Sequence, residues 1–260
     1  MSATELKKRN LFLIMGAFFL ANALIAEFIG VKIFSAERTL GLQPVNWNLF
    51  GETLSFNMTA GVLLWPIVFI MTDLINEYFG RKGVRFFSIL TAILITYAFL
   101  MVWMAMGTDP ADFWMNRKLE NGGVMDMHSA YNAIFGQGLW IIIGSLIAFL
   151  IGQLIDVVVF HALKRKTGEK NIWLRATGST LVSQLIDSFV VLFIAFYVGK
   201  LGTADQWPMS LVLSVCLVNY IYKGVMAIIL TPLLYVAHGL IDKYLGQDLS
   251  LKMRKEAMEN

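Results

Sequence analysis

TGSTLVSQLIDSFVVLFIAFYVG, residues 177–199, is the stretch that decides the fold. It holds one charged residue, Asp187, in 23 positions. At about 1.5 Å per residue, a helix of that length crosses the hydrocarbon core of a bilayer, which is about 30 Å thick. Thr177, Thr180, Gln184 and Asp187 follow the i, i+3, i+7, i+10 spacing that places side chains on one helix face. The stretch therefore predicts a membrane-spanning helix whose polar stripe faces other helices or a water-filled cavity.

The rest of the chain has the same apolar character. Of its 260 residues, 57% are hydrophobic and 15% are charged, and the mean hydropathy is +0.66, far outside the usage of soluble domains. Windows of about 19 residues with few charges mark the spans. We therefore expect an all-α polytopic membrane protein, a single domain over residues 1–260 with six transmembrane helices at approximately 11–34, 56–77, 84–106, 137–163, 177–199 and 209–238.

Basic residues predict the orientation of these spans. Fifteen Lys and Arg residues lie in the N-terminal segment, the turn at 80–85, the connector at 164–175 and the C-terminal segment, whereas the opposite set of loops holds four. Short basic loops stay on the cytoplasmic side, so both termini are expected to be cytoplasmic. The basic residues are divided among separate short segments, which argues against a nucleic-acid partner. As a membrane protein, the chain is expected to contact membrane lipid.

Four charged residues fall well inside the predicted spans: Asp73, Asp156, Asp187 and Lys223. A charged side chain at the centre of a membrane helix costs about 2.5–3.5 kcal/mol on insertion scales. One lysine cannot neutralise three carboxylates, so packing alone explains this set poorly. A ligand, water or a proton is expected to satisfy the remainder, and which aspartate pairs with Lys223 is open at this point.

Uncharged polar residues extend the candidate site. Gln153 shares a helix face with Asp156, and Asn219 lies one turn from Lys223. Glu77 lies near the membrane interface, where a solvated role is expected. Hydrogen bonding between helices is the alternative for the amides and hydroxyls. The candidate substrate-binding residues are Asn22, Asp73, Gln153, Asp156, Ser179, Thr180, Gln184, Asp187, Asn219 and Lys223.

Catalytic and cofactor motifs are missing from the sequence. It has no H-E-x-x-H, G-x-S-x-G or P-loop motif, its three histidines are scattered, and its single cysteine lies in an apolar run. We therefore expect no enzyme activity, no cofactor and no metal site, with an intramembrane enzyme that uses an acid pair as the minor alternative. The segment 107–136 is expected to be a solvated loop, with a lid as the alternative.

Four stretches together resemble a known family: TDLINEYFG at 72–80, GQLIDVVVF at 152–160, STLVSQLIDSFVVLFIAF at 179–196 and NYIYKGVMAIILTPLLYV at 219–236. They resemble the queuosine precursor transporters, also described as vitamin-uptake-like transporters. The resemblance implies a six-helix fold similar to the substrate-binding components of energy-coupling-factor importers, working in the bacterial inner (plasma) membrane without a dedicated ATPase. A binding subunit that needs a separate ATPase is the alternative.

The resemblance also implies a small-molecule substrate, a 7-deazaguanine base such as 7-cyano-7-deazaguanine, 7-aminomethyl-7-deazaguanine or queuine. Such a base presents an N1–H and an amine to a carboxylate, for which Asp156 and Asp187 are the candidates. Its O6 would accept from Lys223, Gln153 or Gln184, and a leftover carboxylate such as Asp73 would pair with Lys223 or carry a coupling proton. Aromatic walls are expected from Phe189, Phe193, Tyr220 and Tyr222.

Overall fold

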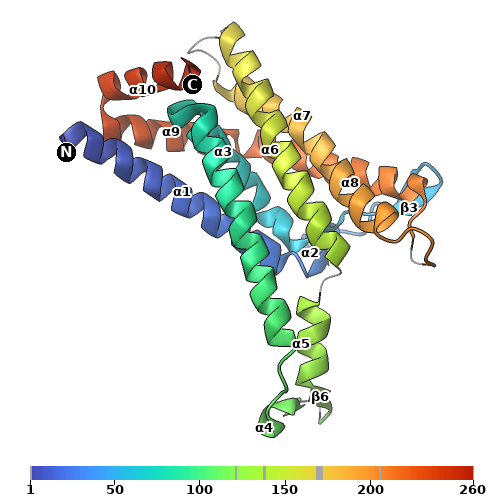
Figure 1. Ribbon diagram of the computed structural model, residues 1–260. Coiled ribbons are helices and arrows are strands. Elements are labelled where there is room, and N and C mark those ends of the chain that lie inside the picture. The colour runs from blue at the N-terminus through green and yellow to red at the C-terminus, as the bar shows by residue number, and fades with distance from the viewer. Residues whose placement is uncertain (1, 121, 137–138, 168–171, 205, 260) are drawn as a thin grey trace.

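The protein is described by a computed structural model that covers residues 2–120, 122–136, 139–167, 172–204 and 206–259. Long helices dominate it (Figure 1). Five helices in this part of the chain are long and apolar enough to cross a membrane: Ala3–Ile29, Trp65–Met106, Ile143–Thr167, Ala176–Val198 and Met209–Ile229. The expected helical membrane fold is therefore present.

The helices have the following bounds. The long helices are α1 (Ala3–Ile29), α3 (Trp65–Met106), α6 (Leu139–Thr167), α7 (Ile172–Leu192), which continues as the π-helical η2 (Phe193–Val198), and α8 (Met209–Ile229). The shorter ones are α2 (Ala36–Thr39), the 3-10 helix η1 (Ala60–Leu63), α4 (Asp112–Met115), α5 (Met127–Phe135), α9 (Thr231–Leu245) and α10 (Gln247–Glu259).

Within the described ranges, six short strands form three antiparallel pairs outside the long helices. The pairs are β1 (Ile33–Ser35) with β4 (Asn57–Thr59), β2 (Trp47–Leu49) with β3 (Glu52–Leu54), and β5 (Asn116–Lys118) with β6 (Val124–Asp126). Hydroxyls of α8 hold the second pair in place, because Ser210 donates to Glu52 at 3.1 Å and Ser214 donates to the Leu49 carbonyl at 2.9 Å.

Helix α3 contains a sharp break at Gly80, whose φ of 67° and ψ of −167° are not helical. A Cβ atom at this position would lie 2.7 Å from the carbonyl oxygen of Ala257, so glycine meets both the backbone angle and the space. Contacts with α1 show that the chain reverses here. Gly61 lies against Ala26 near the end of α1, and Phe79 contacts Phe12 nearer its start. Phe99, beyond the break, contacts Phe28 near the end of α1 again.

The first arm of α3, residues 65–79, therefore runs antiparallel to α1, and the second arm, residues 81–106, runs parallel to it. These arms correspond to the expected spans at 56–77 and 84–106. Residues 56–64 differ from the expectation, because they hold β4 and the 3-10 helix η1 instead of a transmembrane helix.

Two other spans also differ from the sequence expectation. The helix expected over 11–34 begins at Ala3, where Ser2 and Glu5 form a capping box, and it ends at Ile29. The span expected over 209–238 is divided, because α8 ends at Ile229 and α9 begins at Thr231 with a proline in its first turn. Proline has no backbone N–H to continue the hydrogen bonding of the preceding helix.

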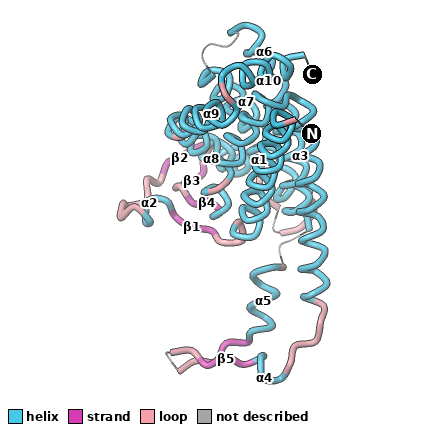
Figure 2. The backbone as a smooth tube through the Cα atoms, turned by 90° about the vertical axis from the view of Figure 1, so that its left-hand side faces the viewer, coloured by secondary structure: helices cyan, strands magenta, loops and turns pink. Residues whose placement is uncertain are grey.

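The two ends of the molecule differ in character. Both termini, α9 and α10 lie at one end, and α4, α5, β5 and β6 form a lobe that projects beyond the other end of α3 (Figures 1 and 2). The lobe is residues 107–136, and its position away from the helix bundle favours the solvated reading over a lid. The core lies where α1, α3 and α6 meet, around Phe19, Val68, Phe149 and Phe160, none more than 3% exposed.

Candidate functional site

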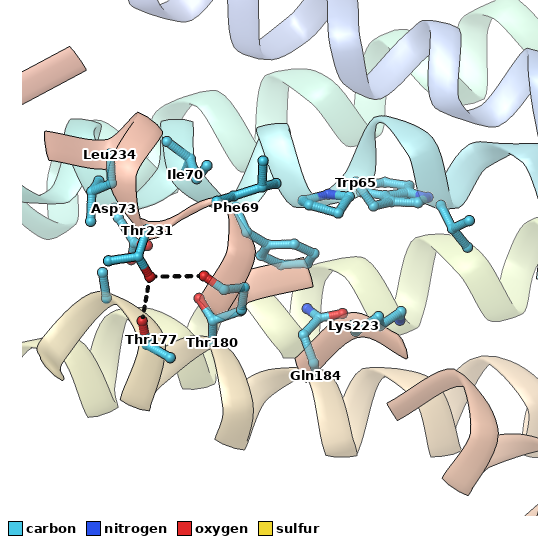
Figure 3. A pocket seen from close by; sticks show the side chains of 15 residues that line it. Trp65, Phe69, Ile70, Asp73, Thr177, Thr180, Gln184, Lys223, Thr231 and Leu234 are labelled. Atoms are coloured by element: carbon cyan, nitrogen blue, oxygen red, sulfur yellow. Dashed lines mark hydrogen bonds between the residues drawn. The ribbon is translucent and has the colours of Figure 1, made fainter. Parts of the chain in front are cut away.

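A cavity lies between the first arm of α3 and helices α7, α8 and α9. It contains about 520 Å³ of space free of protein atoms, counting open solvent at its mouth. Trp65 and Phe69 of α3 supply aromatic surface, and Ile70 and Leu234 supply aliphatic surface. Six polar side chains also line it: Asp73, Thr177, Thr180, Gln184, Lys223 and Thr231 (Figure 3). An apolar cavity with a few converging polar groups is typical of small-molecule sites.

Gln184 is the most informative of these residues. Its side chain is 1% exposed, and neither its Nε2 nor its Oε1 has a hydrogen-bond partner among the residues that the structure describes. A buried amide without partners loses its hydration without compensation, which costs about 1–3 kcal/mol per group. Because Gln184 lines the cavity, its unused donor and acceptor are available to a molecule in that cavity.

Three threonines line the same end of the cavity as Asp73 (Figure 3). Thr231 Oγ1 donates to the Ala227 carbonyl at 3.0 Å and lies 3.4 Å from Thr177 Oγ1. Thr231 reaches this position because α8 ends at Ile229, two residues before it, and α9 begins at Thr231 itself. Gln184 and Lys223 lie toward the other end, so polar groups line the cavity at both ends (Figure 3).

Lys223 pairs with Asp187, with 2.6 Å between Nζ and Oδ2. The two side chains are 14% and 16% exposed, so the pair is largely removed from solvent. The sequence left open which aspartate pairs with Lys223. In the structure, Lys223 of α8 contacts Asp187 of α7. Asp73 is 4% exposed and lines the cavity from α3.

Asp156 and Gln153 lie on α6, outside the cavity lining. Asp156 is 0% exposed and accepts from Ser183 Oγ at 3.3 Å, and its Oδ2 has no hydrogen-bond partner in the described part of the chain. Gln153 Oε1 accepts from Thr72 Oγ1 at 3.0 Å, while its Nε2 likewise lacks a partner within the described ranges. The two residues therefore keep unused hydrogen-bonding capacity in the interior of the helix bundle.

The remaining sequence candidates make local contacts. Asn22 donates to the Phe18 carbonyl of its own helix at 2.8 Å, and Ser179 donates to the Ala176 carbonyl at 3.1 Å. Asn219 is half-buried on α8. None of these three residues is part of the cavity wall, so the cavity brings together four of the ten candidates: Asp73, Thr180, Gln184 and Lys223.

The aromatic residues predicted from the sequence do not line this cavity. The cavity is lined by Trp65 and Phe69 instead of Phe189, Phe193, Tyr220 and Tyr222. Sequence reasoning missed Trp65, Phe69 and Thr231, although Trp65, Phe69 and Asp73 follow an i, i+4, i+8 spacing that places them on one helix face. The spacing of these three residues in WPIVFIMTD, residues 65–73, was the signal available in the sequence.

Glu77 also differs from its expected solvated role. Its side chain is 0% exposed and its Oε2 lies 3.1 Å from Nζ of Lys164, which is 1% exposed. Lys164 belongs to the basic connector that predicted the orientation, yet it points into the protein. Among the described residues, no group of three or more His, Cys, Asp or Glu side chains is arranged to hold a metal ion.

A known protein family matches most of this chain. The model of the family named "Putative vitamin uptake transporter" matches residues 59–237, which include every lining residue of the cavity. A "Probable queuosine precursor transporter" of Bacillus subtilis (strain 168) is 29% identical over 197 residues, covering 73% of this chain and 76% of the relative.

Two further relatives are similar to the chain. The "Queuosine precursor transporter" of Escherichia coli (strain K12) is 27% identical over 180 residues, covering 68% of this chain and 70% of that protein. A "Probable queuosine precursor transporter" of Haemophilus influenzae is 27% identical over 179 residues. No solved structure matches the chain significantly. The family match spans the helices that build the cavity, and the chain therefore belongs to the vitamin uptake transporter family, whose members are transporters and not enzymes.

Proposed function

We propose that this protein imports queuosine precursors, 7-deazaguanine bases, across the bacterial inner membrane through the cavity between α3, α7, α8 and α9. Family membership and the names of the relatives support the substrate class. The observation that carries the proposal for the site is Gln184, an amide buried in the cavity wall with an unused donor and an unused acceptor.

The chemistry of the base fits this amide. The O6 and N1–H of a deazaguanine are an adjacent acceptor and donor, which one side-chain amide pairs with in a bidentate manner. Lys223 is the second donor for O6, and the Trp65 and Phe69 rings supply surface for the flat heterocycle. Asp73 accepts from donors at the ligand's other end. Asp156, Gln153 and Asp187 support the site from behind the cavity wall.

We also propose six transmembrane segments in a single domain, with both termini cytoplasmic. The reversal at Gly80 supports two separate crossings by the arms of α3. The position of both termini at one end of the molecule supports an even number of crossings (Figure 1). The distribution of Lys and Arg assigns that end to the cytoplasm.

The test is ligand binding by the purified protein in detergent. We expect 7-cyano-7-deazaguanine and 7-aminomethyl-7-deazaguanine to raise the melting temperature in a concentration-dependent manner, and unrelated vitamins to leave it unchanged. Uptake of the same bases into proteoliposomes containing this protein alone separates a transporter from the binding subunit of an ATPase-dependent importer. A melting temperature that no deazaguanine changes would refute the proposed substrate class.

A further inference from the structure

The wall of the cavity continues directly into the inner end of the molecule. Helix α9 lines the cavity with Thr231 and Leu234 and carries His238 and Asp242 one and two turns beyond Leu234 on the same face. On the opposite side of this seam, α3 carries Tyr78 five residues beyond the cavity-lining Asp73. Any exit from the cavity between α3 and α9 therefore passes these side chains.

Asp242 joins three helices at this point. Tyr78 of α3 donates its hydroxyl to Asp242 Oδ1 at 2.8 Å, and Ser250 of α10 donates to the same oxygen. His238 Nδ1 lies 3.2 Å from the other carboxylate oxygen, and its ring lies 5.5 Å from the Tyr78 ring. Tyr78 is 2% exposed and Ser250 is 0% exposed, so the seam between α3 and α9 is filled.

A second set of contacts holds α10 against α3 and α6. Lys164 Nζ pairs with Glu77 and also donates to the Arg254 carbonyl of α10 at 3.4 Å. The carbonyl of Ala257 packs against Gly80, at the turn between the arms of α3. A deeply buried ion pair adds little net stability to a protein, because apolar residues of the same volume often stabilise the fold equally well. Its position between α6, α3 and α10 suits a contact that opens and closes.

A single glycine with a positive φ connects α9 and α10. Gly246 joins them with φ 88° and ψ 150°, and a Cβ at this position would meet no atom within 4 Å. Beyond it, α10 is a helix of 13 residues at the edge of the bundle that packs against α3 with one face, where Ser250, Met253 and Ala257 are buried. A peripheral helix on a glycine joint opens at a lower free energy than a core helix.

We propose that α9 and α10 form the inner gate of the cavity, closed by Asp242 and Lys164 and opened by movement of α10 about Gly246. When α10 leaves, Asp242 loses Ser250, and Lys164 and Glu77 become accessible to water. Helix α9 is then free to separate from Tyr78 and to open the cavity toward the end that holds both termini. This inference rests on the proposed import through the cavity.

The first experiment holds the gate shut. Lys8 of α1 and Glu256 of α10 contact each other at 3.2 Å on the surface. In a Cys216→Ala background, Lys8→Cys and Glu256→Cys are joined by a bis-maleimide of about 8–10 Å, a length that matches two long side chains in contact. Each single-cysteine variant, treated with a monofunctional maleimide, is the control.

We expect the cross-linked protein to retain the thermal shift given by 7-aminomethyl-7-deazaguanine and to lose at least about nine-tenths of uptake into proteoliposomes. Uptake at the control rate would overturn the gate, and so would loss of binding, because the cross-link preserves a contact present in the structure. Absence of binding by the protein without cross-linker would instead contradict the proposed substrate class, so the two failures are distinguishable.

The second experiment loosens the gate. Tyr78→Phe removes the hydroxyl bound to Asp242 and keeps the ring. A hydrogen bond to a charged group contributes enough that its loss is expected to raise opening about 10-fold. The readout is the rate at which an impermeant maleimide, applied from the inner side, labels Thr231→Cys in the Cys216→Ala protein. Tyr235→Phe, on the exposed side of α9, is the matched control, and equal labelling of both variants would overturn the proposal.

Discussion

Replacing Gln184 by methionine tests the site, because the change is expected to stabilise the ligand-free protein and to weaken ligand binding. Methionine has a similar length and volume but no hydrogen-bonding groups. The Gln184 side chain is 1% exposed and unpartnered on both atoms within the described residues. Removing those polar groups removes an unfavourable term of about 1–3 kcal/mol from the ligand-free protein. We therefore expect the ligand-free variant to be more stable than the parent.

Ligand binding is expected to weaken in the same variant. Two hydrogen bonds to the base are lost, which corresponds to about 1–3 kcal/mol, or about a 5-fold to 150-fold increase in Kd. The assay is thermal unfolding in detergent with and without 7-aminomethyl-7-deazaguanine. Leu185→Met, on the exposed side of α7, is the matched control. A variant that is less stable than the parent and binds the base equally well would refute the assignment of Gln184 to the ligand.

Three further predictions concern stability. Asp187→Asn leaves Lys223 without its partner and is expected to destabilise the protein by about 3–5 kcal/mol; adding Lys223→Met should recover much of the loss in thermal unfolding, and a double variant as unstable as the single one would contradict the pairing. Gly80→Ala puts a Cβ 2.7 Å from a backbone oxygen at a positive φ and is expected to lower the Tm, with a cost of at least about 1 kcal/mol; an unchanged Tm would contradict the backbone geometry of this turn. Burial raises the pKa of Glu37, but hydrogen bonds from the Phe56 backbone N–H and nearby groups outweigh this effect and lower the pKa below the ordinary 4.5. The Glu37 carboxylate therefore stabilises the protein above pH 4.5, and this contribution is lost as the pH falls through the lowered pKa. Glu37→Gln should reduce this pH dependence in an acid unfolding series.

The sequence predicted the parts of the site that depend on one helix alone. The polar stripe of Thr180 and Gln184 was expected to face the interior, and both residues line the cavity. Spacing along a helix determines which side chains share a face, whatever the neighbours are. The same rule applied to Trp65 and Phe69 would have found the aromatic wall, because they share their face with Asp73.

Contacts between helices were less predictable. Glu77 and Lys164 are separated by a long stretch of chain and were assigned to interfacial and loop environments, yet they form a buried pair. Their meeting depends on how α3 and α6 are rotated and at what depth they lie side by side. Hydropathy carries no information about either quantity, because both are set by the packing of side chains between helices.

By itself, the sequence determined that this chain lies in a membrane, that its helices carry polar faces and that charged residues inside the spans need partners. Those conclusions follow from the free energy of apolar burial and from the helical repeat, which are properties of each segment alone. Only the tertiary structure decided that Lys223 pairs with Asp187, that Asp156 lies outside the cavity wall and that α9 and α10 cover the end of the molecule that holds both termini. These features depend on distances between segments remote in the chain, which only the assembled helices specify.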